Sequence, residues 1–367
     1  MVEVTPFKGY RPEQPGKFST KTYDIISDSE AREFRKELEC VIHCSLPING
    51  NNPFAAAMLS EFRTAGIIRQ DDKPGFYIYE TGDDNYQQRG IIACVNINDY
   101  LEGGIHGHEL TRDASLADRI DHLGRTRANI DPVWMLCRDE PLLSSYMDLM
   151  MLGRPNTSLK KFGYHHKLWQ DSNPKNIEYI EEILRNHSLY IADGHHRVGA
   201  AAEHYNKQGD IEHLMVFITL ENESRIFPYN RLVNNVSREK LFDNLDSFNV
   251  EKADFHKPEK KGEIVFCVDD SWFRAAPVRQ EYKFDVEMLQ YELLEKIGIT
   301  DPRTDPNLSF VGGVDGDIRL QENQVYFSMF PITPQELMET ADAGNILPPK
   351  STYFHPKPIT GLVLKID

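Results

Sequence analysis

The fold of this chain depends on one stretch, residues 189–203, which reads LYIADGHHRVGAAAE. Its first four residues are apolar and predict a short buried strand. Asp193-Gly194 is a turn dipeptide whose aspartate can cap a helix. From Val198 onward, small and apolar residues recur at helical spacing. The stretch therefore predicts a strand, an abrupt turn and a helix.

Four polar residues follow the predicted strand: Asp193, His195, His196 and Arg197. They fall at a helix N-terminus, which has free backbone N–H groups and favours anions. Arg197 can donate two parallel hydrogen bonds to a phosphate, and Asp193 can hold Mg²⁺ or orient a histidine. Gly194 lets a ligand approach the backbone. The alternative is a simple helix cap with surface histidines, but the run of functional residue types favours a ligand site.

The motif Asp-Gly-His-His-Arg at 193–197 resembles the phosphate-binding motif of the ParB-like superfamily, which includes the partition protein ParB, sulfiredoxin and the free-serine kinases. The rest of the chain resembles one branch, the domain of unknown function 1015 family. The stretches that carry this resemblance are 6–9, 23–27, 108–111 and 350–357. It implies an α+β fold with a ParB/sulfiredoxin-like nucleotide-binding core and additional N-terminal and C-terminal α+β regions around it.

Three regions are expected along the chain. Residues 1–100 form an N-terminal α+β region, and residues 101–235 form the core with the motif. Residues 236–367 form a C-terminal α+β region that returns Lys350-Ser351-Thr352 to the site. Strands and helices do not alternate strictly, which favours α+β over a doubly wound sheet.

Local patterns predict individual elements. A capping box at 27–30 begins a helix that reaches about residue 40. A second capping box at 333–336, with proline at the first helical position, begins another helix. Further predictions are a buried strand at 41–46, an antiparallel pair at 75–80 and 90–98, a charged helix at 113–129, and helices at 237–248 and 284–297.

Composition excludes several classes of protein. The net charge is −16 and no long basic run occurs, which argues against a general DNA or RNA binder but permits a local nucleotide pocket. No apolar run approaches the roughly 18 residues of a membrane span. The first residues lack the basic and apolar segments of an export signal, so a cytoplasmic location is predicted. The five cysteines form no C-x-x-C pair, so they are expected to be reduced thiols.

His108-Glu109 follows a glycine-rich loop and precedes a predicted helix. A carboxylate there can act as a general base toward a hydroxyl, or it can simply complement the helix dipole. In the free-serine kinases a His-Glu pair upstream of the motif occupies a similar place, and its glutamate is the proposed base. The resemblance implies that role for Glu109 and a substrate contact for His108. The 84 residues between positions 109 and 193 mean that only the fold can bring them together.

Further residues could bind the substrate. Lys350-Ser351-Thr352 resembles the Pro-Lys-(Ser/Thr)-Thr segment of the free-serine kinases and suits a carboxylate or phosphate, although it could be an ordinary strand start. Arg231 could clamp a carboxylate or phosphate, or it could form a surface ion pair.

Tyr23, Asp24 and Ser27 could frame the nucleotide, because their motif is distinctive of the family. From the residues alone they are equally well a turn and a helix cap. His165 and His166 are adjacent on a predicted strand and point to opposite faces, so no metal site is expected there.

Taken together, the sequence predicts a phosphotransferase that uses ATP or ADP with Mg²⁺ on Asp193. Its expected acceptor is a small hydroxyl amino acid, with free L-serine favoured. Glu109 would take the proton of the hydroxyl, and His195, His196 and Arg197 would stabilise the charge of the transferring group.

The alternative is a ParB-like nucleotide-binding switch or scaffold without a metabolic product. ParB proteins pair the nucleotide site with a helix-turn-helix, but here one helix and then a strand follow Arg197. The expected partners are a nucleotide and a hydroxyl amino acid, with no nucleic acid, no membrane and at most a second copy of the chain in a homodimer.

Overall fold

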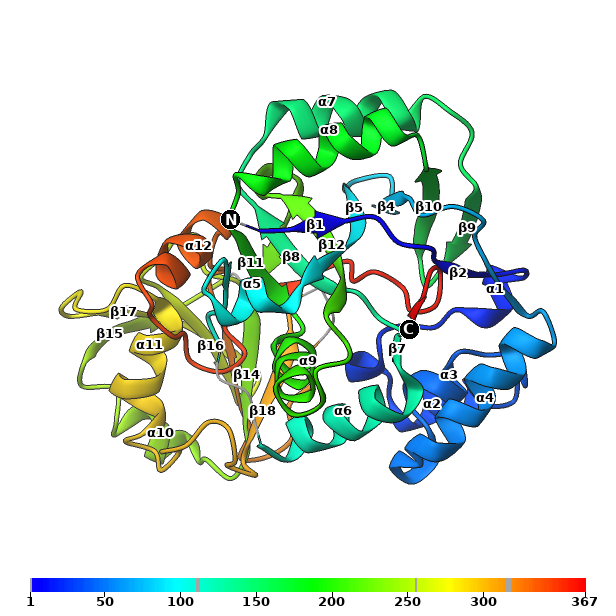
Figure 1. Cartoon of the computed structure of the whole chain (residues 1–367). Coiled ribbons are helices and arrows are strands. Elements are labelled where there is room, and N and C mark those ends of the chain that lie inside the picture. Colours follow the sequence, from blue (N-terminus) through cyan, green and yellow to red (C-terminus); the bar gives the residue numbers. More distant parts are fainter. Residues whose placement is uncertain (1, 110–112, 255, 314–317) are drawn as a thin grey trace. The chain divides into compact units, whose positions relative to one another are not determined.

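The computed structural model describes residues 2–109, 113–254, 256–313 and 318–367 (Figure 1). The chain forms two compact units. Unit 1 consists of Met1–Ser224 and Pro356–Asp367, and unit 2 consists of Arg225–His355. The fold is mixed α+β with several sheets, as predicted. The unit boundaries differ from the three expected regions 1–100, 101–235 and 236–367, because strands of the first two regions share one sheet.

The described part of unit 1 is built on a nine-stranded mixed sheet. The strands run in the order β6 (Ile105–His106), β11 (Leu189–Asp193), β8 (Val133–Cys137), β12 (His213–Leu220), β5 (Gln87–Asn96), β4 (Phe76–Gly82), β10 (Tyr164–Asp171) and β9 (Thr157–Lys161), with β1 (Val4–Thr5) paired to β5. β11 is parallel to β6, and β12 is parallel to β8. The predicted antiparallel pair is confirmed as β4 and β5.

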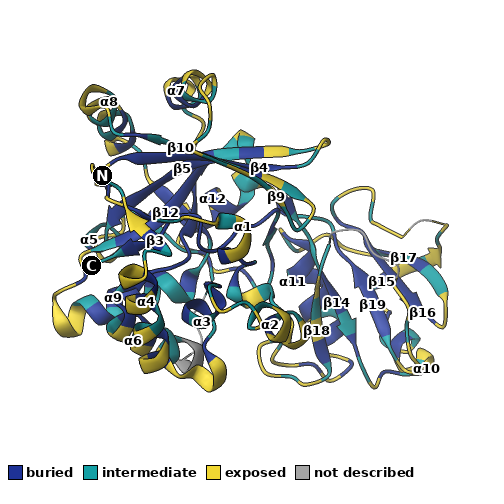
Figure 2. Cartoon of the chain, turned by 90° about the vertical axis from the view of Figure 1, so that its right-hand side faces the viewer, coloured by how far each residue is buried: buried dark blue, intermediate teal, exposed yellow. Residues whose placement is uncertain are grey.

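Helices cover both faces of this sheet. Figure 1 shows α7 (Pro141–Met151) and α8 (Pro174–Arg185) on one side, and α9 (His195–Gln208) and α6 (Asp113–Thr126) on the other. β8 and β12 are almost continuously apolar and buried, as is typical of strands covered on both faces. Figure 2 shows the buried residues of the neighbouring strand β5 in dark blue. The short helix α5 (Ile97–Leu101) links β5 to β6.

A second apolar cluster lies under the N-terminal helices of unit 1 and includes Phe18, Phe62 and Leu364. The elements that contribute to it are β2 (Tyr10–Pro12), α1 (Pro15–Phe18), α3 (Ile42–Ser45), α4 (Asn52–Thr64), β3 (Ile68–Gln70), β7 (Ala128–Asn129) and β21 (Lys365–Ile366). The same part of the chain also contains η1 (Tyr23–Ile25), α2 (Asp28–Phe34) and η2 (Ile48–Gly50). Residues 356–367 are fastened to it, because β21 pairs with β7 and the backbones of Tyr10 and Leu364 exchange hydrogen bonds.

Two local predictions in this part of unit 1 are wrong. The strand expected at 41–46 is the helix α3, because a short buried apolar run has no periodicity that separates a strand from a helix. The helix that begins at the capping box is confirmed, but α2 ends at Phe34 instead of reaching residue 40.

The described part of unit 2 contains a six-stranded antiparallel sheet. Its order is β15 (Phe248–Lys252), β17 (Ser271–Pro277), β16 (Ile264–Val268), β19 (Val325–Ser328), β14 (Tyr229–Val233) and β18 (Leu308–Gly312). A separate pair joins β13 (Ile226–Phe227) to β20 (Tyr353–Phe354).

The helices of unit 2 are shorter than predicted. The helix expected at 237–248 is α10 (Arg238–Phe242), and residue 248 already begins β15. The helix expected at 284–297 divides into α11 (Asp285–Leu289) and the π-helical turn η4 (Gln290–Leu294). The capping box of α12 (Pro334–Asp342) is confirmed.

No helix in the described ranges is long and apolar enough to span a membrane. All five cysteines are buried and free, as predicted.

Candidate active site

The predicted strand, turn and helix at 189–203 are confirmed. β11 ends at Asp193 and α9 begins at His195. Gly194 is the N-cap between them, with φ 106° and ψ 28°, a backbone conformation that residues with a side chain rarely adopt. Gly194, and not Asp193, therefore occupies the N-cap position of α9, and the Asp193 carboxylate contacts two cations.

The Asp193 carboxylate lies between two cations. Its Oδ2 accepts a hydrogen bond of 2.9 Å from Arg197 Nη2, and its Oδ1 accepts one of 2.8 Å from Lys357 Nζ. The same Nζ donates to Asp24 Oδ2 at 2.6 Å. The Lys357 side chain is only 3% exposed. Burial alone would lower the pKa of Lys357, but Asp193 and Asp24 outweigh it and raise that pKa above its usual value.

This network bears on the Mg²⁺ predicted at Asp193. Both oxygens of the carboxylate already bind a cation, so Mg²⁺ there would lie beside Arg197 and Lys357 and be repelled by both. As arranged, Asp193 does not fit a magnesium ion. Its role as a metal ligand stays a prediction that requires one of these cations to move.

Arg197 covers the turn. Its Nη1 donates to the carbonyl of Pro132 at 2.6 Å. A Cβ added to Gly194 would lie 2.9 Å from both Nε and Nη2 of Arg197, so the guanidinium fills the space that a ligand was expected to use. Among the described residues, nothing accepts a hydrogen bond from the buried Nε of Arg197. One strong donor therefore remains at this turn for an anion.

A small cavity of about 50 Å³ lies beside Arg197. That volume holds a few water molecules or part of a small ligand, but not a nucleotide. Its polar lining comes from η1, α3, α6, β7, the segment before β8, and α9. These residues are Tyr23, Ser45, Arg119, His122, Asn129, Asp131 and Arg197. The guanidinium of Arg119 lies 4.6 Å from the centre of the Tyr23 ring.

Two charges at this cavity were not identified from the sequence. Asp131 is buried, its pKa is raised by that burial, and it accepts a hydrogen bond from the Thr360 hydroxyl. Arg119 lies on α6 and contacts Tyr23. A carboxylate directly before a buried apolar strand was the available signal for Asp131. Arg119 lies in a charged helical segment that offers no such signal.

The fold brings His108 and Glu109 to the motif. β6 pairs in parallel with β11, with Ile105 opposite Leu189 and His106 opposite Tyr190. Because the carboxyl ends of parallel strands meet at one edge, the residues after β6 lie beside the start of α9. Leu110 and Thr111 of the same family stretch lie outside the described residues.

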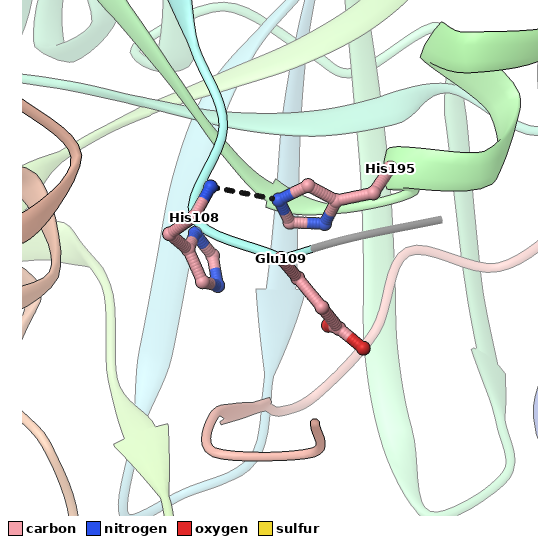
Figure 3. A group of neighbouring side chains, drawn as sticks. All are labelled: His108, Glu109 and His195. Atoms are coloured by element: carbon pink, nitrogen blue, oxygen red, sulfur yellow. Dashed lines mark hydrogen bonds between the residues drawn. The ribbon is translucent and has the colours of Figure 1, made fainter. Parts of the chain in front are cut away.

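His108, Glu109 and His195 form a cluster (Figure 3). The backbone N–H of His108 donates to Nε2 of His195 at 3.3 Å, and the two rings lie edge to face with centroids 4.6 Å apart. One nitrogen or oxygen from each of the three side chains lies within 4.8 Å of the others. Burial lowers the pKa of His108 to about 4, against a hydrogen bond with the Ile191 backbone and the charge of Asp193, so its ring is neutral at pH 7.

The other residues predicted for the nucleotide are placed as follows. Tyr23 and Asp24 lie on η1. The Tyr23 ring contacts Arg119, and the Asp24 carboxylate accepts a hydrogen bond from Lys357. His196 lies on the first turn of α9 and is partly buried. Ser27 is the N-cap of α2, and its hydroxyl accepts from the backbone of Glu30 at 3.3 Å.

The remaining substrate residues belong to unit 2. Arg231 is buried, so the alternative of a surface ion pair is wrong, and burial lowers its pKa to about 10. Its guanidinium donates to the backbone carbonyls of Lys350 at 3.2 Å and Pro349 at 3.4 Å. Arg231 therefore holds the loop that carries Lys350, Ser351 and Thr352.

Comparison with models of protein families identifies a family that matches most of the chain. The model of a family described as "Protein of unknown function (DUF1015)" matches residues 4–297. No curated protein matches the chain.

Three solved structures are similar in fold, each at low identity. SbnI with a C-terminal truncation from Staphylococcus aureus is 12% identical, with 73% of this chain and 85% of that chain covered and a TM-score of 0.44. A conserved hypothetical protein from Pyrococcus furiosus is 13% identical, with 74% and 93% covered and a TM-score of 0.38. A mutant free serine kinase in complex with AMP is 13% identical, with 72% and 87% covered and a TM-score of 0.39. These scores are too low to carry a functional argument.

Proposed function

The chain belongs to the DUF1015 family, and we propose that it is a nucleotide-dependent phosphotransferase. Its donor is ATP or ADP, and its acceptor is the hydroxyl group of a small amino acid, with free L-serine favoured. The proposal rests on the geometry at the start of α9 and on the motif resemblance of residues 193–197 to free-serine kinases. The nucleotide core is then the sheet of unit 1 with β11 and α9, in a ParB/sulfiredoxin-like arrangement.

One observation carries the proposal. Parallel pairing of β6 with β11 puts the Glu109 carboxylate beside His195, at the N-terminus of the long helix α9. Arg197, the cation of the motif, follows His195 by two positions. A base and an anion-binding turn are the two parts that phosphoryl transfer to a hydroxyl requires, because catalysis is mainly positioning and charge stabilisation.

Each group then has a role. The backbone N–H groups at the start of α9 and the buried Nε of Arg197 bind phosphate oxygens. Glu109 accepts the proton of the acceptor hydroxyl. His195 and His196 stabilise the transferring group, and Lys357 positions Asp193 and Asp24.

Other predicted roles remain proposals on the motif resemblance alone. They are substrate binding by His108, Arg231, Lys350, Ser351 and Thr352, and nucleotide contacts of Tyr23, Asp24 and Ser27. Mg²⁺ ordinarily accompanies nucleotide phosphates, but no step is assigned to it at Asp193.

The test is a product assay by mass spectrometry. Purified protein with Mg²⁺ is incubated with ATP, ADP or CTP and with serine, threonine or homoserine. We expect a phosphoester of serine, and a loss of about 100-fold or more in Glu109→Gln, because a general base contributes about 10²–10⁴-fold. Glu102→Gln is the matched control, since Glu102 is an exposed carboxylate on the preceding loop and should retain full activity.

Three outcomes would oppose the proposal. Full activity in Glu109→Gln would remove the base role. No phosphoester with any pair would remove phosphotransfer. Nucleotide binding or hydrolysis without a phosphorylated product would instead support the ParB-like switch or scaffold.

A further inference from the structure

We propose that His108, Glu109 and His195 bind a divalent transition-metal ion of the Zn²⁺ class. The site is distinct from any magnesium that accompanies a nucleotide, and it stands without the proposed function, because it depends only on the three side chains and their places in the fold.

The geometry suits a metal ion after a small adjustment. One donor atom from each side chain lies within 4.8 Å of the other two (Figure 3). Tetrahedral zinc with bonds of about 2.1 Å holds its ligand atoms about 3.4 Å apart. The donor atoms therefore have to approach one another by at most about 1.4 Å, which rotation of the side chains can supply.

The donors are held by the fold. His108 and Glu109 follow β6, His195 begins α9, and the parallel pairing of β6 with β11 keeps both segments at one edge of the sheet. The two histidines are 1% and 8% exposed, whereas Glu109 is partly exposed. A site with three protein ligands and an open side leaves a fourth position for water or a ligand.

The donor set selects the ion. Two imidazoles and one carboxylate suit zinc and its transition-metal neighbours, whereas Mg²⁺ and Ca²⁺ prefer oxygen ligands. One competing contact is weak, because the hydrogen bond from the His108 N–H to His195 Nε2 is 3.3 Å, at the long end of the range. His108 also has a hydrogen bond with the Ile191 backbone, which helps to hold its ring in place.

Metal binding would change what Glu109 can do. Zinc bound to one carboxylate oxygen withdraws electron density and lowers the basicity of the whole group, so occupancy of the site weakens the base role of Glu109. This consequence rests on the proposed function: zinc would then inhibit phosphotransfer.

Isothermal titration calorimetry with Zn²⁺ tests the site, using the whole untagged chain after treatment with a chelator. We expect one Zn²⁺ per chain, with affinity reduced at least about 100-fold in His195→Ala and in Glu109→Gln, because each loses one of three ligands. His165→Ala is the control, since His165 is an exposed histidine on β10 and should bind like the original protein. Mg²⁺ should not bind at these three residues, so its titration should be the same in the original protein and in His195→Ala.

Substitution with Co²⁺ gives a second readout, because its visible absorption reports nitrogen and oxygen ligands in a tetrahedral site. Zinc binding that survives both Glu109→Gln and His195→Ala would place the ion elsewhere, and absence of binding would overturn the proposal. Circular dichroism of each variant shows whether it folds, and Glu109→Gln changes a partly exposed side chain. No nucleotide is present, so failure of the metal site and failure of phosphotransfer are measured separately.

Discussion

Replacing Lys357 by methionine removes the ammonium between Asp24 and Asp193 and keeps most of the side-chain volume. The Nζ atom lies 2.6 Å from Asp24 Oδ2 and 2.8 Å from Asp193 Oδ1. In Lys357→Met both carboxylates lose this partner. We expect the variant to be less stable and to bind nucleotide less tightly, because Asp193 also orients Arg197.

The magnitude follows from burial. Removing one partner of a buried ion pair usually costs about 3–5 kcal/mol. The side chains of Asp24 and Asp193 are 29% and 26% exposed, and Arg197 still neutralises Asp193. Water and Arg197 reduce the penalty, so we expect a loss of about 2–3 kcal/mol in the free energy of unfolding at pH 7.

The sign of the pH dependence follows from the raised pKa of Lys357. A lysine whose pKa is higher in the folded state stabilises the fold fully below its unfolded pKa, and the contribution disappears only as pH rises through the folded value. The difference between the original protein and Lys357→Met should therefore be present throughout neutral pH.

Urea denaturation followed by circular dichroism measures the effect. Lys365→Met is the matched control, because it removes an ion pair with Asp367 in the same C-terminal segment. We expect a smaller cost there, because Lys365 loses one carboxylate partner whereas Lys357 loses two. Adding Asp24→Asn to Lys357→Met should recover part of the loss by removing one uncompensated charge. A Lys357→Met variant as stable as Lys365→Met, or a double variant less stable than Lys357→Met, would refute the reasoning.

Three further predictions concern backbone, cap and buried charge. Gly194→Ala should lower the free energy of unfolding by about 1–2 kcal/mol because of its positive φ, and it should reduce nucleotide affinity by displacing Arg197. Gly209→Ala, at φ 69° with open space around it, should affect stability alone. Equal nucleotide affinities in the two variants would contradict this prediction. Ser27→Ala should cost about 1 kcal/mol through loss of the α2 cap and should also weaken nucleotide binding through the proposed contact. An unchanged nucleotide affinity would leave Ser27 with the cap role alone. Burial raises the pKa of Asp285 to about 6, so ionisation of its carboxyl destabilises the fold as pH rises. Asp285→Asn should therefore raise the free energy of unfolding by about 1–3 kcal/mol at pH 7.5 and leave it unchanged at pH 4. Thermal unfolding that shows a gain at both pH values would exclude ionisation of Asp285 as the cause.

The parts of the site that were predicted correctly carry strong local signals. An apolar run, a turn dipeptide and small residues at helical spacing identify β11 and α9 without knowledge of the rest of the chain. The capping boxes at Ser27 and Thr333 likewise depend on residues only three positions apart.

The parts that were missed depend on contacts between distant residues. Lys357 meets Asp24 and Asp193 across 333 and 164 positions, and no local pattern records either pair. β6 has two residues beside glycines, too few for a periodicity, and yet its pairing brings Glu109 to His195. The cavity beside Arg197 was missed for the same reason, because its lining residues are spread along the chain from Tyr23 to Leu214.

The position of Lys357 in the chain has a consequence for biosynthesis. The ribosome makes all of unit 2, residues 225–355, before it makes the segment that completes unit 1. During that interval Asp24 and Asp193 are already translated, but the ammonium that joins them is not. A nascent chain that stops at residue 355 would contain the whole Asp-Gly-His-His-Arg motif and still lack a finished site. Maturation of the site is therefore a late event, which follows synthesis of the inserted unit and which ribosome-bound nascent chains of increasing length would reveal.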